Sequence, residues 1–308
     1  MSNKSDMSKM SDWQDSLAHV IRKNYRLDKH EEVDLEDWKP DRPDWAPSKS
    51  VVRDEILPIY KGQMLHYQSL LYAENQRSLL IVLQALDSAG KDGMIRHVFT
   101  GFNPQGCQVH PFQEPSSLEK DHDYLWRIVK ALPSRGNVGI FNRSHYEDVT
   151  AARIYNTPVN DGCLPSYCLG KDLWKNRYED INRFEEYLQR QGTEILKFFL
   201  YIDYDEQRER LLARIDEPEK NWKFKKSDVE NRKRWKETIE IYEECLRETA
   251  TPYAPWYIVP SNSKWYSRLV VAETVCEKLK EMDPKVPDMT SPDAQETLAR
   301  YKEILLND

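Results

Sequence analysis

A glycine–lysine pair in the first third of the chain has the surroundings of a phosphate-binding loop. The segment ALDSAGKDG (85–93) directly follows an apolar run, and a helical pattern follows it at 91–100. Backbone N–H groups at the start of a helix point toward a bound anion, and the helix dipole favours negative charge there. Lys91 adds a mobile positive charge that can reach a phosphoryl oxygen. This order of strand, loop and helix predicts a Walker A phosphate site, with substrate contacts from Ser88, Ala89, Gly90, Asp92 and Gly93.

Two positions depart from the usual Walker A pattern. The first glycine is replaced by Ala85, and the serine or threonine after the lysine is replaced by Asp92. That hydroxyl normally ligates Mg²⁺, so metal ligation must come from carboxylates, and Asp87 inside the loop is the candidate. An ordinary strand-to-helix turn is the alternative interpretation, but the strand and helix patterns on either side favour the phosphate site.

A second polar segment, GIFNRSHYED (139–148), ends another apolar run. Polar residues at the carboxyl end of a parallel strand line the crevice in which α/β proteins bind ligands. Asn142 stands where a Walker B strand would end in aspartate, and Arg143 beside it can neutralise a phosphoryl group in transfer. An ion pair between Arg143 and Glu147 is the structural alternative, although arginine four residues before glutamate is the weaker orientation. His145 is interpreted as a structural hydrogen-bonding residue, because phosphoryl transfer needs little acid–base chemistry.

Two carboxylates, Glu147 and Asp148, lie about one helical turn beyond Arg143. A Mg²⁺ site usually takes one or two protein carboxylates and completes its shell with waters and phosphates. Asp148 is therefore predicted to join Asp87 as a metal ligand, directly or through water. Adjacent residues on a helix point about 100° apart, so Glu147 is predicted to face the acceptor and influence its choice, or else to pair at the surface.

The segment from Pro218 to Lys236 concentrates positive charge on an otherwise acidic chain. It holds eight Lys/Arg against three acids, whereas the whole chain has a net charge of −7 and a pI of about 5.7. A local basic cluster predicts a polyanion site, and a solvated helix face is the alternative. Trp222 and Trp235 within it are expected to pack in the core, and stacking on a base is the alternative.

Short, continuous apolar runs alternate with helical patterns, which indicates a parallel sheet covered by helices and predicts an α/β fold. A capping box, Ser227 with Glu230, is predicted to start the helix at 227. Ser291-Pro292 is predicted to start a surface helix near the C-terminus. The expected strands are 79–83, 138–141, 195–202 and 256–259, and the expected helices are 57–74, 91–100, 115–131, 172–191, 204–215, 227–248 and 264–281.

The composition restricts the class of protein. The 308 residues are 39% hydrophobic and 11% aromatic, enough to fill a core. No apolar run approaches the ~20 residues needed to span a membrane, and the N-terminal MSNKSDMSKM has no hydrophobic segment for secretion. The five cysteines lack a tight metal spacing, so neither a disulfide framework nor a zinc site is expected. We expect a cytoplasmic protein whose polar first 50 residues, with a short helix at 13–22, pack on the core through Trp38 and Trp45.

Six strings, in register, resemble the polyphosphate kinase 2 family. They are ALDSAGKDG, HDYLWR (122–127), FNRSHYED, ILKFFLYI, NWKF with the D, R and W that follow it, and YAPWYIVP, and they run from about residue 55 to 282. Aspartate after the lysine is the family's own form of the Walker A loop. The form FNRSHYED is most similar to single-domain members of the third subgroup, which phosphorylate both AMP and ADP from inorganic polyphosphate.

The resemblance implies a P-loop kinase-like, three-layer α/β fold with a central parallel sheet and a helical lid over a polyphosphate channel. Its implied parts are an N-terminal arm (1–54), a kinase domain (55–285) with the lid at about 214–236, and a C-terminal helical tail (286–308). It also implies a Mg²⁺-dependent enzyme, with Mn²⁺ as an alternative ion. This enzyme would move the terminal phosphoryl group of polyphosphate reversibly to AMP and ADP.

The resemblance assigns roles to individual residues. The implied catalytic residues are Asp87, Lys91, Arg143 and Asp148, of which Asp87 and Asp148 hold the metal. The expected partners are polyphosphate and adenine nucleotides, with guanine nucleotides as further acceptors, in a homodimer or homotetramer without nucleic acid or membrane. An ATP-dependent nucleotide kinase and a non-catalytic polyphosphate-binding protein are the alternatives. Substrate contacts are implied for the loop residues named above and for Arg96, Asn142, Glu147, Arg214, Lys223 and Arg232.

Overall fold

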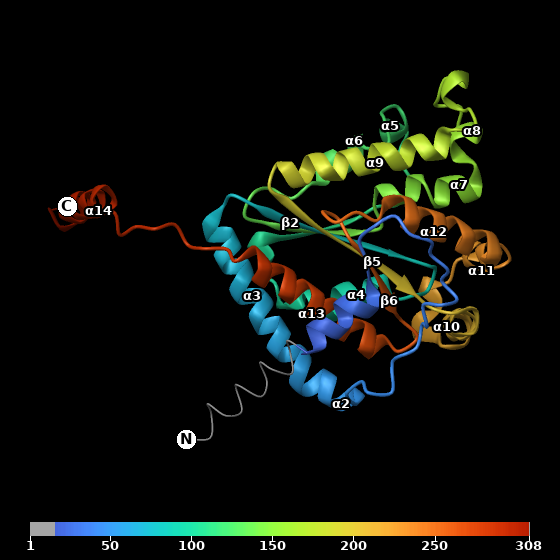
Figure 1. Cartoon of the computed structure of the whole chain (residues 1–308), viewed down its shortest axis with the longest axis horizontal. Helices are drawn as coiled ribbons and strands as arrows, with labels where there is room; N and C mark the ends of the chain where they lie inside the picture. Colours follow the sequence, from blue (N-terminus) through green and yellow to red (C-terminus); the bar gives the residue numbers. More distant parts are fainter. Residues whose placement is uncertain (1–15, 308) are drawn as a thin grey trace.

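The computed structural model describes residues 16–307 and contains one six-stranded sheet between two layers of helices (Figure 1). The strand order is β1-β6-β5-β2-β4-β3, and every pair is parallel except β1 with β6. The predicted α/β fold with a central, mostly parallel sheet is confirmed. The strands are β1 (Arg26–Leu27), β2 (Ser78–Ala85), β3 (Cys107–Pro111), β4 (Val138–Asn142), β5 (Thr193–Tyr201) and β6 (Trp256–Pro260).

The central strand β2 ends at the predicted phosphate-binding segment 85–93, called the phosphate loop below, and so places it at the carboxyl edge of the sheet near its centre. All eight of its residues are buried, as expected for a strand covered on both faces. Its parallel neighbours are β4 on one side and β5 on the other, in a register that pairs Leu80 with Gly139 and with Ile195. The connection that leaves β2 leads to β3 beyond β4, whereas the connection that leaves the neighbouring β5 leads to β6 on the other side. The carboxyl end of β2 therefore lies at a topological switch point, where α/β proteins bind ligands.

Helices cover both faces of the sheet. On one face lie α3 (Leu57–Glu74), α4 (Lys91–Val98) and α13 (Lys264–Met282), and on the other α6 (Trp126–Ala131), α9 (Leu173–Arg190) and α12 (Trp235–Thr249) (Figure 1). The remaining helices are α2 (Lys49–Val51), followed by a π-helical segment (Val52–Ile56), and α5 (Ser117–Lys120), α7 (Ala151–Tyr155), α8 (Thr157–Asn160), α10 (Tyr204–Asp216), α11 (Lys226–Arg232) and α14 (Pro292–Asn307). Short 3₁₀ turns span Phe99–Gly101, Pro104–Gly106, His145–Asp148, Ser166–Cys168 and Pro218–Lys223.

Two of the predicted helices are each divided into two in the structure. The helix expected at 115–131 is two helices, α5 and α6, because the Asp123 carboxylate accepts from the Leu125 N–H and opens a new turn. The helix expected at 227–248 is divided into α11 and α12, and it starts at Lys226, so Ser227 and Glu230 form no capping box. Edge strand β3 was not predicted, because its sequence CQVHP has no apolar run.

The described part of the N-terminal arm packs against the same core as the sheet. Residues 16–25 are helical, and the first residues of the helix expected at 13–22 lie outside the described range. Leu27 and Leu35 are buried, Trp38 packs against the core, and half-exposed Trp45 meets the ring of Tyr266 edge-on. The arm thereby covers the β6 edge of the sheet. The division at residues 54 and 285 stays a prediction.

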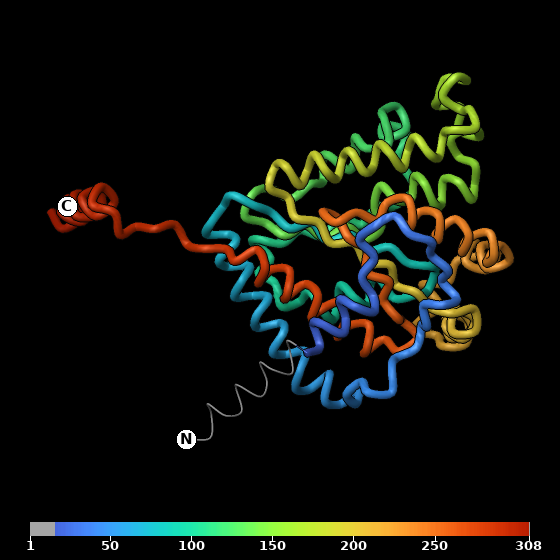
Figure 2. Tube along the Cα trace, in the orientation of Figure 1, coloured from blue at the N-terminus to red at the C-terminus, as the bar shows by residue number. Residues whose placement is uncertain are grey.

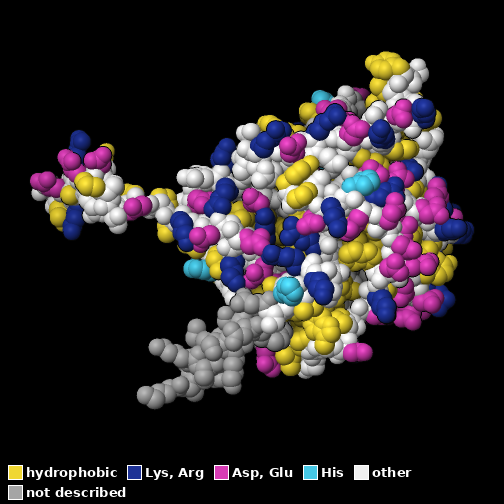
Figure 3. All heavy atoms as spheres, in the orientation of Figure 1, with side chains coloured by type: hydrophobic (Ala, Val, Ile, Leu, Met, Phe, Trp, Pro, Cys, Tyr) yellow, Lys and Arg dark blue, Asp and Glu magenta, His cyan; other side chains and the backbone are white. Residues whose placement is uncertain are grey.

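Helix α14 extends away from the body at the end of a long connection (Figure 2). None of its residues is buried, as expected for the predicted surface helix. On the face of the molecule drawn in Figure 3, acidic and basic side chains are interspersed. Within residues 16–307, no helix is both long enough and apolar enough to cross a membrane.

Candidate active site

A cleft of about 2250 Å³ opens at the carboxyl edge of the sheet. The phosphate loop forms its floor, and the turn after β4, helices α7 and α9 and the segment from α10 to α12 form its walls. The structure therefore brings together residues that are far apart in the sequence. Of the predicted site residues, those that line the cleft are Asp87, Ser88, Ala89, Gly90, Lys91, Asp92, Gly93, Arg96, Asn142, Arg143, Glu147, Asp148, Arg214 and Lys223.

The phosphate loop has a backbone that suits anion binding. Ser88 (φ 67°) and Gly90 (φ 111°) adopt left-handed conformations just before α4 begins at Lys91. Alternation of this kind turns successive N–H groups toward one side and forms a concave anion site. Lys91 donates to the Ala85 carbonyl (3.2 Å), and burial, with Arg143 nearby, lowers the pKa of Lys91 to about 8. A bound polyanion would favour the charged ammonium at this position.

Asp92 and Asn142, which both depart from the usual Walker sequences, are in direct contact. The Asn142 side-chain amide at the end of β4 donates to the Asp92 carboxylate (3.0 Å). In the ordinary pattern the hydroxyl follows the lysine and the carboxylate ends the strand. In this chain the carboxylate, Asp92, lies in the loop, and the neutral amide of Asn142 at the end of the strand holds it by a hydrogen bond.

Arg143 lies between two carboxylates at the mouth of the phosphate loop. Its guanidinium is 3.2 Å from Glu147 and 3.6 Å from Asp87, and these charges, Glu147 first, raise its pKa. The i,i+4 ion pair weighed from the sequence is therefore present, but Arg143 also reaches the phosphate loop. Its φ of 64° is strained for a residue other than glycine, and such strain is concentrated at functional sites.

Asp148 lies in a wall of the cleft and belongs to a 3₁₀ turn, not to the helical turn assumed from the sequence. Its carboxylate is 3.7 Å from Arg127, while Arg177 donates to its main-chain carbonyl. The atom Oδ2 is buried and has no hydrogen-bond partner, and burial raises the pKa of Asp148 to about 6 despite the two arginines. A buried carboxylate oxygen of this kind fits a ligand with positive charge.

Comparisons with known proteins agree with this geometry. Residues 49–287 match the family described as Polyphosphate kinase 2 (PPK2). The chain belongs to the polyphosphate kinase 2 family. It is 42% identical over 287 residues to the ADP-polyphosphate phosphotransferase of Rhodopseudomonas palustris, covering 93% of this chain and 99% of that one. It is also 42% identical to the AMP/ADP-polyphosphate phosphotransferase of Meiothermus ruber, over 86% of this chain and 95% of that one.

A solved structure of the family supports the fold as well. The crystal structure of polyphosphate kinase 2 from Arthrobacter aurescens TC1 matches with a TM-score of 0.77 and 34% identity, covering 89% of this chain and 95% of that one. The family, the fold class and the enzyme class predicted from the sequence motifs are confirmed. The catalytic, substrate-binding and metal-binding roles of the individual site residues remain predictions.

In this polyphosphate kinase 2 chain, Arg210 binds the main chain of the phosphate loop, a role that was not predicted from the sequence. Arg210 on α10 is buried and uses every donor of its guanidinium. It donates to the carbonyls of Ser88 and Ala89 in the loop and to those of Ser261 and Asn262 after β6. Only the i,i+4 spacing of Glu206 and Arg210 was visible in the sequence, and it predicts a surface pair.

The predicted lid, residues 214–236, contributes fewer unpaired positive charges to the cleft than the sequence suggests. Arg214 pairs with Asp228 (2.6 Å). Arg232 does not line the cleft, because it donates to the Tyr204 carbonyl and to Gln207, and its guanidinium stacks on the Tyr204 ring. Lys223 lines the cleft beside Trp222. The polyphosphate roles predicted for these three basic residues remain predictions.

The two lid tryptophans differ from each other. Trp222 is 78% exposed, so the core position expected for it is wrong, whereas Trp235 packs against the core and meets the Tyr204 ring. Sequence reasoning also missed two cations on α13 that line the cleft, Lys264 and Arg268. Burial lowers the pKa of each, and neighbouring positive charges, Arg210 first, lower that of Lys264 further. A crowded positive field of this kind suits a polyanion.

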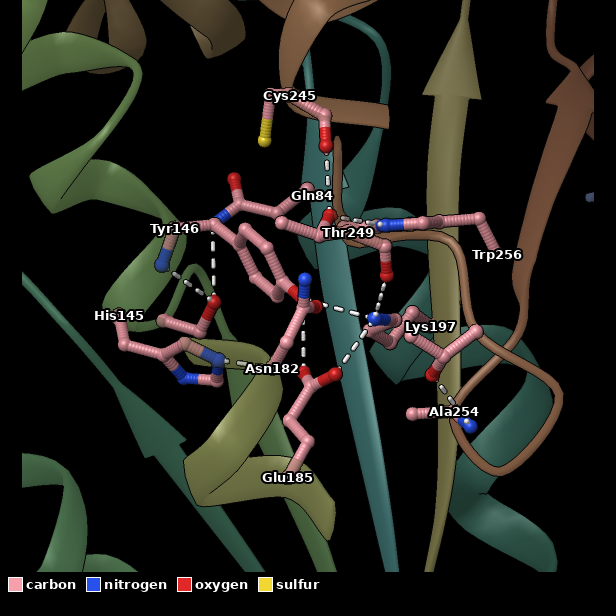
Figure 4. A network of polar contacts seen from close by, with 12 residues as sticks. Gln84, His145, Tyr146, Asn182, Glu185, Lys197, Cys245, Thr249, Ala254 and Trp256 are labelled. Carbon is pink, nitrogen blue, oxygen red and sulfur yellow. Dashed lines mark hydrogen bonds and ion pairs between the residues drawn. The ribbon is translucent and has the colours of Figure 1, made fainter. Parts of the chain in front are cut away.

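His145 takes no part in the cleft, as predicted, and belongs to a buried network beneath it (Figure 4). The Lys197 ammonium on β5 donates to Glu185 (2.6 Å), to the Tyr146 hydroxyl and to the Thr249 carbonyl. Glu185 also accepts from the Tyr146 hydroxyl and lies 3.4 Å from the His145 ring. The network therefore fixes the turn that carries Arg143 and Glu147 to three other elements of the core.

Proposed function

We propose that this chain is a Mg²⁺-dependent phosphotransferase that moves the terminal phosphoryl group of inorganic polyphosphate to AMP and to ADP, reversibly. The observation that carries the proposal is the placement of Asp87, Lys91 and Arg143 around one cleft in a chain of the polyphosphate kinase 2 family. Two relatives over most of its length are named for polyphosphate and for ADP or AMP/ADP.

In the proposed reaction the protein positions its substrates and neutralises charge. A phosphate oxygen of the nucleotide attacks the terminal phosphorus of polyphosphate, and the bridging P–O bond breaks, leaving the polymer one unit shorter. Lys91 and Arg143 face the transferring group and offset the negative charge spread over its oxygens. No covalent enzyme intermediate is required, because the two substrates meet directly in the cleft.

The proposed metal site consists of Asp87 and Asp148. Hard carboxylate oxygens suit Mg²⁺ or Mn²⁺, and the buried Oδ2 of Asp148, which forms no hydrogen bond and lies 3.7 Å from Arg127, is the kind of atom that a cation would satisfy. Among residues 16–307 no three His, Cys, Asp or Glu side chains form a ready metal cage, which agrees with an ion that takes most of its ligands from phosphates and water. When bound, the ion supplies charge neutralisation between adjacent phosphate groups.

The two alternatives have less support. An ATP-dependent nucleotide kinase shares the phosphate loop but has no use for the additional cations on α13 and in the lid. A non-catalytic polyphosphate-binding protein has no need of a strained arginine held beside the loop by two carboxylates. We propose cytoplasmic action in a homodimer or homotetramer, with guanine nucleotides as secondary acceptors.

One assay tests the proposal and separates it from both alternatives. Purified protein is incubated with Mg²⁺ and polyphosphate, AMP or ADP is added, and formation of ADP and ATP is followed. We expect both products, and we expect no transfer when Mg²⁺ is chelated. Transfer from ATP to AMP with none from polyphosphate would favour the ordinary kinase, and binding of polyphosphate without any turnover would favour the binding protein.

A further inference from the structure

One side chain of the lid, Asn231 on α11, touches the phosphate loop directly. Its amide nitrogen donates to Oδ2 of Asp87 (2.8 Å), and its amide oxygen accepts from the hydroxyl of Tyr155 at the end of α7. Asn231 thereby joins three elements, the phosphate loop, the predicted lid and helix α7. All three residues line the cleft.

The chemistry of this contact suits the orientation of a carboxylate that must stay negatively charged. The amide of Asn231 is neutral, so it holds Oδ2 of Asp87 in place without neutralising the carboxylate. A positively charged side chain, such as those of Arg232 and Lys233 that follow in the chain, would compete with a metal ion for the carboxylate. The Tyr155 hydroxyl holds the amide oxygen, which leaves the amide nitrogen for Asp87. The other carboxylate oxygen, Oδ1, faces Arg143 at 3.6 Å.

A second path connects the same helix to the same residue. Arg232, next to Asn231, donates to Oε1 of Gln207 (3.2 Å), and Nε2 of Gln207 donates to the main-chain carbonyl of Asp87 (3.2 Å). Adjacent residues of α11 thus reach both the carboxylate and the backbone of Asp87. The position of the lid and the orientation of Asp87 are therefore not independent.

We propose that Asn231 is a positioning residue that orients the Asp87 carboxylate toward the metal only when α11 lies against the phosphate loop. The proposal rests on the function proposed above, in which Asp87 is a metal ligand. Closure of the lid would then complete the metal site, so that phosphoryl transfer is competent only after water has been displaced from the cleft. Tyr155 extends this coupling to α7.

The test compares Asn231→Ala, Asn231→Asp and Tyr155→Phe with a control, Glu230→Gln, which changes an exposed neighbour on the same helix. Loss of a hydrogen bond to a charged group is expected to lower kcat of Asn231→Ala by about 10- to 100-fold. The Mg²⁺ concentration for half-maximal rate should rise as well, with little change in the KM for polyphosphate. Tyr155→Phe should show the same pattern more weakly, and the control should match the wild type.

A readout without turnover separates positioning from simple lid stability. Hydrogen exchange of the peptides that contain α7 and α11 is measured on the protein alone and with Mg²⁺ and ADP. Exchange should be faster in Asn231→Ala than in the wild type. In Asn231→Asp the new carboxylate repels that of Asp87, so Mg²⁺ should slow exchange more than it does in the wild type.

Two results would overturn the inference. If Asn231→Ala exchanges faster but keeps the wild-type kcat and Mg²⁺ requirement, Asn231 only stabilises the lid. If kcat falls with an unchanged Mg²⁺ requirement, Asp87 is not oriented by it. The failure of the proposed function itself would be seen in the wild type, as turnover that needs no divalent ion.

Discussion

The buried guanidinium of Arg210 offers a sharp test of how the phosphate loop is held. Its five N–H groups bind four main-chain carbonyls and Glu206, and the carbonyls belong to the phosphate loop on one side and to the loop after β6 on the other. We consider Arg210→Lys, which keeps the charge, and Arg210→Met, which keeps most of the length. A lysine ammonium has three donors on a single atom, so it cannot span both loops.

The expected magnitudes follow from these contacts. Arg210→Met leaves the carbonyls of Ala89 and Ser261 without a donor at contacts that are buried, and at about 1–3 kcal/mol for each buried polar group the free energy of unfolding should fall by roughly 2–6 kcal/mol. Arg210→Lys should lose about half as much. Because a displacement of about 1 Å at a reacting centre can cost ~10²-fold in rate, kcat should fall by one to two orders of magnitude in both variants.

The assays are urea unfolding and steady-state formation of ATP from ADP and polyphosphate. The matched control is Arg208→Lys, which changes an arginine on the same helix that forms an exposed pair with Asp205. The control should lie within about 0.5 kcal/mol of the wild type, as surface substitutions usually do. Wild-type stability and turnover in Arg210→Lys would refute the reasoning. A single positive charge would then be enough to hold the two loops, and the several donors of the guanidinium would not be needed.

Four further predictions concern single side chains. Lys91→Ala should fold normally and lose about 10²–10³-fold in kcat, the usual effect of removing one preorganised donor; near-normal turnover would show that the phosphate loop is assigned wrongly. Lys223→Glu should raise the KM for polyphosphate and flatten its dependence on salt, and a raised nucleotide KM instead would move Lys223 to the other substrate. Asp148→Asn should lower kcat and demand more Mg²⁺, whereas Glu147→Gln should chiefly shift the AMP/ADP preference; a Mg²⁺ titration of both variants decides, and a wild-type requirement in Asp148→Asn would remove its metal role. Burial raises the pKa of Glu273 from its ordinary 4.5 to about 8, so the folded protein keeps a proton that the unfolded chain releases, and stability should fall as the pH rises from about 4.5 to about 8. Glu273→Gln should therefore raise the melting temperature more at pH 8 than at pH 5, and equal shifts at the two pH values would contradict this.

Strong local patterns predicted much of the fold. The apolar run after Arg77 became β2 with residues buried on both faces, and the helix expected at 57–74 has those bounds in the structure. These elements follow from hydrophobic periodicity, which burial enforces along the whole segment. The helix expected at 227–248 is interrupted between Arg232 and Trp235. Its Asn231 and Arg232 contact the phosphate loop and α10, and no local pattern encodes such contacts.

The candidate site was predicted where residue types and chain order were enough. The phosphate loop, Arg143 and the two carboxylates after it lie around one cleft, as expected, because parallel strands deliver their carboxyl ends to one edge of the sheet. The part that could not be predicted consists of residues whose role depends on a partner far along the chain. Arg210 reads as a surface ion pair in the sequence, and Lys264 and Arg268 read as the start of an ordinary amphipathic helix.

The sequence by itself determined the family, the fold class and the enzyme class, because these depend on the order of residues along the chain and on the periodic spacing of apolar residues. Only the tertiary structure decided how the charges are used. In the structure Arg214 forms an ion pair with Asp228, and Arg232 stacks on the Tyr204 ring. Asn231 donates a hydrogen bond to Asp87. The physical reason is that electrostatic and hydrogen-bond energies depend on distance and burial in three dimensions, which a count of charges along the chain does not contain.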